Sequence, residues 1–220
     1  MRIKKIAAVR GIFVTGTDTG AGKTYVSCLI ASAVAAGRRV SVFKPYLSGS
    51  RADARKLLAA SGSSQRIDEV NPYFFKAPLA PFVAARLEKK RISVAHTVET
   101  FKKACRAADF VIVEGAGGLF VPVAGGFHII DLIKKLRLPA VLVSRAGLGA
   151  INHTLLSVEA LSRRKIRTAA VVINNYTGRG AAQKTNPAVI RKYVSAPVFV
   201  VKKDACRAPK GLLKCILKKV

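Results

Sequence analysis

The sequence lacks any hydrophobic run long enough to cross a membrane. Its longest nearly apolar stretch, residues 27–36, is interrupted by Ser32 and falls well short of the roughly 20 residues that a membrane helix needs. Only a short apolar patch precedes Arg10, and no small-residue cleavage site follows it, so the N-terminus is not typical of a secretory signal. We therefore expect a cytoplasmic protein with no membrane partner.

Cysteine is scarce, and its spacing excludes two further classes of protein. The four cysteines are Cys28, Cys105, Cys206 and Cys215. They form no CxxC pattern and have no histidine nearby, which argues against a zinc site and against a disulfide framework. We expect reduced thiols with structural or surface positions.

Acidic residues are few: 11 Asp and Glu stand against 39 Lys and Arg, which gives a net charge of +28. A dedicated nucleic-acid-binding domain gathers its charge on one face or in one motif. Here the basic residues are spread over the whole chain, so we expect no specific nucleic-acid partner, and a surface that binds polyanions is the alternative. The clusters are residues 2–5, 86–91, 102–106, 134–137, 163–167, 202–203 and 218–219.

Apolar runs rich in Val, Ile and Phe alternate with helix-length segments, a pattern that predicts an α/β fold. The expected strands are residues 12–14, 40–43, 110–113, 140–143, 169–173 and 198–201, and the expected helices are residues 23–36, 94–107, 129–136, 151–163 and 186–193. Strands that are apolar on both faces favour a mostly parallel sheet flanked by helices.

The chain length suits a single domain. We expect one domain of the phosphate-loop (P-loop) NTPase type over residues 1–220, with residues 201–220 as a basic C-terminal segment of uncertain structure. The connection between the second and third strands, residues 47–109, is long and is expected to hold about three helical segments. Insertions of this size usually carry function or an extra layer.

Residues 16–24, GTDTGAGKT, follow the first predicted strand and open the first predicted helix. Glycines let backbone N–H groups curl round a phosphate, and the N-terminus of the helix adds positive dipole. Lys23 reaches the β and γ phosphates, and the Thr24 hydroxyl can ligate magnesium. The strict motif needs glycine where Thr17 stands, so this loop is a variant. A merely structural turn is the alternative, but the strand-loop-helix context favours nucleotide binding.

The second predicted strand is followed by KPYLSG, residues 44–49. A lysine at this strand end, next to the phosphate loop, can stabilise charge on a transferred phosphoryl group. In a chain so rich in lysine, Lys44 can equally be one surface lysine among many. Asp53, just beyond, is by default a surface residue that caps a helix.

Two further predicted strands end in polar residues. Glu114 follows the third strand, where phosphate-loop enzymes hold magnesium. Gly117 and Gly118 follow it and let the backbone approach a small ligand, although a plain tight turn is the alternative. At the end of the fifth strand, Asn174 can pair with the adenine edge through one donor and one acceptor, and is equally a common turn residue.

Together these motifs resemble the dethiobiotin synthetase family over roughly residues 11–197. The motifs are GTDTGAGKT, KPYLSG, Asp53, NPYFF (71–75), VEGAGGLFVP (113–122), GAINH (149–153) and Asn174, in this order and spacing. The position of Gly20 varies in that family. A larger departure is residues 200–211, VVKKDACRAPKG, which stand where the family usually has a Gly- and Pro-containing segment that helps to enclose adenine.

The resemblance implies a role for each matching residue. Lys23 and Lys44 would stabilise phosphoryl charge, and Thr19 and Ser48 would position carbamate and phosphate oxygens. ATP would contact Gly16, Thr17, Asp18, Gly20, Ala21, Gly22, Lys23, Thr24, Tyr25 and Asn174. The organic substrate would contact Lys44, Ser48, Gly117, Gly118 and Asn152, and Mg²⁺ would be held by Thr24, Asp53 and Glu114.

The implied reaction joins 7,8-diaminononanoate and CO₂ at the expense of ATP, with Mg²⁺, and closes a cyclic urea to give dethiobiotin, ADP and phosphate. The resemblance also implies a homodimer in which residues 147–153 lie near the partner's substrate.

One alternative is a ParA/MinD-like ATPase that binds DNA or a membrane, but those proteins carry a signature lysine where this chain has Asp18. A degenerate non-catalytic relative is another. The synthetase domain of an amide-forming corrinoid enzyme needs an attached glutaminase domain, for which the length leaves no room.

Overall fold

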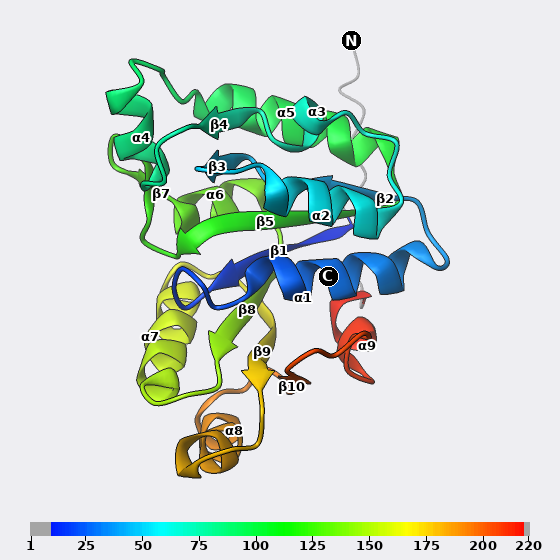
Figure 1. The fold of residues 1–220 in the computed structure, drawn as a ribbon, viewed down its shortest axis with the longest axis vertical. Coiled ribbons are helices and arrows are strands. Elements are labelled where there is room, and N and C mark those ends of the chain that lie inside the picture. The colour runs from blue at the N-terminus through cyan, green and yellow to red at the C-terminus, as the bar shows by residue number, and fades with distance from the viewer. Residues whose placement is uncertain (1–9, 218–220) are drawn as a thin grey trace.

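Six parallel strands form the central sheet of the protein. The structure, a computed structural model, describes residues 10–217. The strands run in the order β10-β9-β8-β1-β5-β2, and every neighbouring pair is parallel (Figure 1). Their bounds are β1 Gly11–Gly16, β2 Val40–Phe43, β5 Phe110–Gly118, β8 Ala140–Arg145, β9 Thr168–Tyr176 and β10 Val198–Lys202. The predicted α/β fold with a parallel sheet is confirmed.

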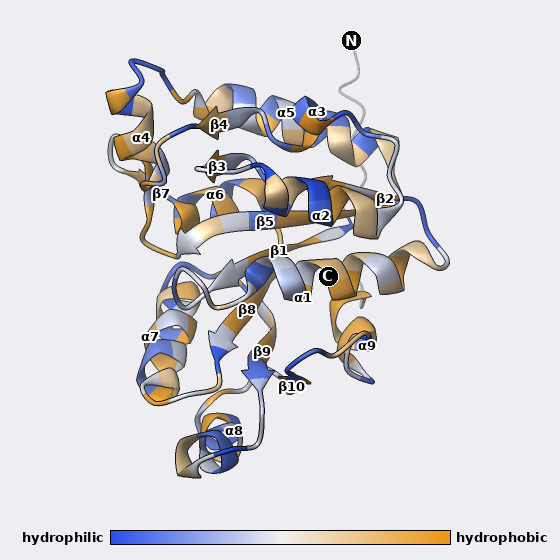
Figure 2. Ribbon diagram, in the orientation of Figure 1, coloured by the Kyte–Doolittle hydropathy of each residue, from blue (hydrophilic) through white to orange (hydrophobic). Residues whose placement is uncertain are grey.

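Helices cover both faces of the sheet because alternate side chains of each strand point to opposite sides. Ile12 and Val14 of β1 pack in the apolar cluster that includes α1 and α2, whereas Phe13 packs on the other face with α5 and α6. Figure 2 shows the hydrophilic residues gathered in peripheral segments such as the α1–β2 loop. The helices around the sheet are α1 Lys23–Ala35, α2 Ala52–Ser61, α5 Val94–Ala107, α6 Ile129–Leu136, α7 Ala150–Arg163, α8 Ala181–Tyr193 and α9 Leu212–Leu217.

The long connection between β2 and β5 holds more structure than the sequence predicts. It contains four helices, not three: α2, α3 (Ile67–Val70), α4 (Pro81–Leu87) and α5. Two short strands, β3 (Tyr46–Ser48) and β4 (Tyr73–Phe75), pair in parallel as a separate small sheet. A strand of three residues has too little periodicity to be recognised in the sequence. A further hairpin, β6 (Pro122–Ala124) and β7 (Phe127–His128), follows β5.

Several predicted boundaries are wrong, and most of them are strand ends placed too early: β1 continues to Gly16 and β8 to Arg145. β5 continues through the glycines to Gly118, and β9 continues through Asn174 to Tyr176, so these residues belong to strands and not to loops. Helix α8 begins at Ala181, five residues before the predicted start at Asn186, although Pro187 lies inside it.

The segment after β10 folds back onto α1. Leu212 and Ile216 of α9 are buried in the same apolar cluster as α1, and the Tyr25 hydroxyl donates to the backbone oxygen of Ala205 at 2.5 Å. The predicted basic clusters at residues 2–5 and 218–219 lie outside the described residues. Within residues 10–217, no helix has the length and apolar character that spanning a membrane requires.

Leu212→Ala should lower the free energy of unfolding by about 2 to 4 kcal/mol, because it removes a side chain that is buried between α9 and α1. Lys214→Ala, on the exposed side of the same helix, should change it by less than about 0.5 kcal/mol. Urea denaturation measures both. Equal midpoints for the two variants would contradict the packing of α9.

The cysteines should differ sharply in reactivity. Burial raises the pKa of Cys28 to about 11 and that of Cys105 to about 12, whereas Cys206 is exposed. At pH 8 only about one Cys28 thiol in a thousand is ionised, and the thiolate is the reactive form. Iodoacetamide should therefore modify Cys206 first, and Cys28 and Cys105 only after denaturation, as peptide mass spectrometry can follow. Native-state labelling of Cys28 at the rate of Cys206 would show the opposite.

Candidate functional site

A cleft of about 700 Å³ lies where β1, β2 and β5 end. Parallel strands bring their carboxyl ends to one edge of the sheet, which is where open α/β sheets bind ligands. The loop of residues 78–81, from the long β2–β5 connection, forms part of the opposite wall. Ten of the predicted site residues line this cleft: Thr19, Gly20, Gly22, Lys23, Thr24, Lys44, Ser48, Asp53, Glu114 and Gly117.

The backbone of the phosphate loop between β1 and α1 is left-handed at two glycines. Gly20 and Gly22 have φ of +75° and +89°, a conformation that other residues rarely adopt. The loop brings Lys23 to the start of α1, where its amine donates to the backbone oxygen of Asp18 at 3.1 Å. Burial, and secondly the nearby positive charge of Lys44, lower the pKa of Lys23 to about 8. An anion in the cleft would favour the charged form of this amine.

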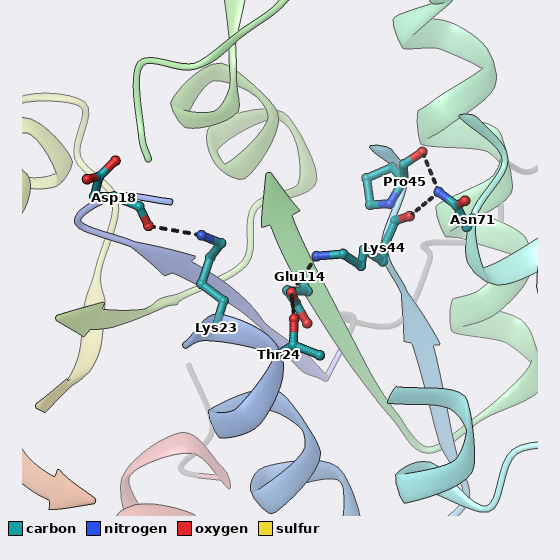
Figure 3. A network of polar contacts seen from close by, with 7 residues as sticks. All are labelled: Asp18, Lys23, Thr24, Lys44, Pro45, Asn71 and Glu114. Carbon is teal, nitrogen blue, oxygen red and sulfur yellow. Dashed lines mark hydrogen bonds and ion pairs between the residues drawn. The ribbon is translucent and has the colours of Figure 1, made fainter. Parts of the chain in front are cut away.

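The centre of the site is the carboxylate of Glu114, which is fully buried at the end of the apolar part of β5. One oxygen, Oε1, accepts a hydrogen bond from the Thr24 hydroxyl at 2.7 Å and forms an ion pair with the Lys44 ammonium (Figure 3). The other oxygen, Oε2, has no partner within residues 10–217. A buried carboxylate oxygen without a partner is costly, so it marks a place for a ligand.

Lys44 is held in place by a residue that sequence reasoning did not single out. The side-chain nitrogen of Asn71, also buried, donates to the backbone oxygens of Lys44 and Pro45 at 2.9 and 3.4 Å (Figure 3). The backbone N–H of Lys44 in turn donates to the oxygen of Val70. The signal in the sequence was the NPYFF stretch, whose first residue is Asn71.

The oxygens around Glu114 suit a magnesium ion. Mg²⁺ prefers oxygen ligands, keeps several waters and needs only one or two carboxylates from the protein. Thr24 and Glu114 are in contact with each other, Asp53 lines the same cleft, and Oε2 of Glu114 has no partner within the described part of the chain. Within residues 10–217, no group of three or more His, Cys, Asp or Glu residues could hold a metal ion.

Eight predicted site residues lie outside the lining of the cleft. Gly16 and Gly118 are register partners of β1 and β5, and a Cβ at Gly118 would meet the backbone oxygen of Thr17 at 3.3 Å. Asn174 lies beneath the phosphate loop, only 5% exposed. Asn152 is exposed near the start of α7. The full set outside the lining is Gly16, Thr17, Asp18, Ala21, Tyr25, Gly118, Asn152 and Asn174.

Comparison with solved structures shows the fold. The septum site-determining protein MinD of Pyrococcus horikoshii, solved with Mg-ADP, superposes with a TM-score of 0.57 at 18% identity and covers 94% of this chain and 86% of its own. At identity this low, the comparison shows only the architecture, which is that of phosphate-loop NTPases.

Comparison of sequences goes further than the fold. A family model described as an AAA domain matches residues 10–201. The ATP-dependent dethiobiotin synthetase BioD of Bacillus licheniformis is 41% identical over 200 residues, which covers 88% of this chain and 85% of that protein. The BioD of Anaeromyxobacter sp. (strain K) is 47% identical over 171 residues, 76% of this chain and 77% of that protein. With this identity over this share of both chains, the protein belongs to the ATP-dependent dethiobiotin synthetase family.

Proposed function

We propose that this protein is a dethiobiotin synthetase, which uses MgATP to carboxylate 7,8-diaminononanoate and close its cyclic urea. The observation that carries the proposal is the contact of Glu114 with both Lys44 and Thr24 beside the phosphate loop. This arrangement places a buried carboxylate, a buried ammonium and a hydroxyl in one cleft. Relatives at 41% and 47% identity bear the name of that enzyme.

ATP binds with its phosphates in the loop of residues 16–24. The N–H groups of the loop and the N-terminal end of α1 receive the phosphate oxygens, and the amine of Lys23 leaves the Asp18 oxygen for them. Asn174 and Tyr25 do not line the cleft, and we expect the nucleotide's base and ribose near them. To reach adenine, the Nδ2 of Asn174 would have to leave the backbone oxygen of Ala21. Phosphoryl transfer needs positioning and charge stabilisation more than covalent help, which two lysines and hydroxyl donors provide.

The diamine reacts first with CO₂, and one amine forms a carbamate with release of a proton. An oxygen of the carbamate attacks the γ-phosphorus, breaks its bond to the bridging oxygen and releases ADP. Lys23 and Lys44 stabilise the charge that develops on the transferred group, and Thr19 and Ser48 orient the oxygens. The second amine then attacks the carbamate carbon, loses its proton and expels phosphate, which closes the urea ring. Gly117, with φ of +60°, lets the backbone approach the substrate closely.

Thr24, Asp53 and Glu114 would hold Mg²⁺, which neutralises charge on the β and γ phosphates when bound. Thr24 can keep donating its hydroxyl hydrogen to Oε1 of Glu114 while a lone pair of its oxygen would serve the ion, and Oε2 of Glu114 has no partner in the described residues. Lys44 is then free to turn from the carboxylate toward the phosphate.

We further propose that the enzyme acts as a homodimer in the cytoplasm, with no specific nucleic-acid partner. Asn152 does not line the cleft of its own chain, and a substrate role for it requires the cleft of a second chain. Two large apolar side chains near it in the sequence are exposed: Leu148 is 96% exposed and Leu156 56% exposed. Exposed apolar groups gathered in one place mark interaction sites.

Phosphate release should require the diamine and bicarbonate, because the nucleophile exists only on the bound substrate. The experiment measures phosphate from MgATP with both co-substrates, with each alone, and with DNA or lipid vesicles in their place. We expect turnover only with both co-substrates, and dethiobiotin in equal amount by mass spectrometry. Rapid hydrolysis without diamine, or stimulation by DNA or lipid, would favour the ParA/MinD-like alternative.

Lys23→Met and Lys44→Met should each reduce kcat by on the order of a hundred- to a thousandfold, because each removes a donor that stabilises transition-state charge. Lys192→Met, an exposed residue of α8, changes net charge equally and should retain activity. Turnover of Lys44→Met close to that of Lys192→Met would contradict the catalytic role of KPYLSG.

Lys44→Met also leaves Glu114 without its ammonium, and breaking a buried ion pair costs about 3 to 5 kcal/mol of stability. The double variant Lys44→Met/Glu114→Gln removes the uncompensated charge. It should recover much of the stability without recovering activity, which separates loss of chemistry from loss of fold.

A further inference from the structure

Two neighbouring strands each place one side chain on the outer side of the phosphate loop. Arg145 ends β8 and lies opposite Asn174 of β9 in the strand register. The Nη2 of Arg145 donates to the backbone oxygen of Thr19 at 2.8 Å. The Nδ2 of Asn174 donates to the backbone oxygen of Ala21 at 3.1 Å. Each of the two strand ends therefore holds one carbonyl group of the loop. One further peptide unit lies between these two carbonyls.

The geometry of the peptide unit determines where the N–H groups that follow these carbonyls point. A trans peptide is planar, so its C=O and N–H groups point in opposite directions. The Thr19 carbonyl belongs to the same peptide unit as the Gly20 N–H, and the Ala21 carbonyl to the same unit as the Gly22 N–H. Each carbonyl that is held toward β8 or β9 directs the N–H group of its own unit the other way. Gly20 and Gly22 line the cleft on that other side.

We propose that Arg145 and Asn174 are positioning residues that fix the Gly20 and Gly22 N–H groups as donors to a bound polyphosphate. The inference rests on the proposed function only in that the loop binds phosphate. Without these contacts the glycine peptides could rotate and would have to be ordered again each time an anion binds. Donors that are already oriented avoid that cost.

The fit of the two side chains against the loop is close. A Cβ at Gly20 would lie 2.8 Å from Nη2 of Arg145, and a Cβ at Gly22 would lie 1.9 Å from Nδ2 of Asn174. At Gly22 a Cβ is excluded by space as well as disfavoured by φ, because Asn174 is buried, whereas at Gly20 the exposed end of Arg145 could move aside. The side chains that approach these glycines so closely are the ones that hold the neighbouring carbonyls.

The two positions are unequal as experimental probes. Asn174 is buried, and its Oδ1 has no partner within residues 10–217, so a substitution there disturbs the interior as well as the loop. Its nitrogen, a donor that adenine recognition would need, is engaged by Ala21. Arg145 is exposed and carries one side-chain contact to the loop, which makes Arg145→Ala the cleaner test.

The test compares Arg145→Ala with Arg167→Ala. Arg167 is exposed just before β9, at the opposite end of the same two strands, so both variants lose one positive charge. Two quantities are measured: the affinity for inorganic tripolyphosphate by calorimetry, and the hydrogen-exchange rate of the peptide containing residues 17–23 without ligand. Tripolyphosphate has no base and no reaction partner, so neither readout depends on the carboxylation chemistry.

For Arg145→Ala we expect faster exchange in the loop and an affinity weaker by on the order of tenfold, the scale of one hydrogen bond from a charged donor. Added guanidinium ion should recover part of the affinity, and Arg167→Ala should match the parent in both measurements. Unchanged exchange in Arg145→Ala overturns the inference, even with weaker binding, because long-range charge alone would then explain the loss. If the parent protein does not bind tripolyphosphate, it is the proposed function that fails.

Discussion

A fully buried carboxylate imposes the main constraint on this structure. Glu114 ends an apolar strand at the centre of the sheet, and a charge removed from water costs several kcal/mol unless it is paired and hydrogen-bonded. The Lys44 ammonium and the Thr24 hydroxyl provide that compensation, one from the end of β2 and one from the first turn of α1. The same contacts fix the three elements that form the cleft relative to one another. The β2–β5 connection is fixed relative to these elements as well, because the side chain of Asn71 donates to the backbone oxygen of Lys44.

The two buried amines of the site favour the binding of a polyanion. Lys23 and Lys44 both have buried side chains, and burial and then the charge of Lys44 lower the pKa of Lys23. Lys23 donates to the backbone oxygen of Asp18, and Lys44 pairs with Glu114. A polyphosphate would offer both amines stronger acceptors and relieve their repulsion. Binding would then replace the contacts that these two amines make within the protein, so the same side chains serve stability and function in turn.

The sequence was sufficient for the elements whose signal is local or follows from a general rule. The phosphate loop, the parallel sheet, and the meeting of Lys44 and Glu114 at one edge all follow from motif chemistry and from the geometry of parallel strands. The features that the sequence could not predict depend on contacts between residues that are distant in the chain. The strands β3 and β4 are too short for a periodic pattern, and the Arg145 contact spans 126 positions of sequence. Asn71 was visible as part of a motif, but its donors to the backbone at Lys44 require the tertiary structure.

With a net charge of +28, the protein attracts many polyanions, and its site must distinguish ATP from them. Long-range attraction brings any polyanion to such a surface, so charge alone cannot separate ATP from other phosphates. Discrimination must come from direction and shape, which long-range attraction lacks. The loop presents N–H groups at Gly20 and Gly22, and a Cβ at Gly22 would lie 1.9 Å from Nδ2 of buried Asn174, so this part of the loop has a defined shape. In so basic a chain, directed N–H donors of this kind supply selectivity that net charge cannot.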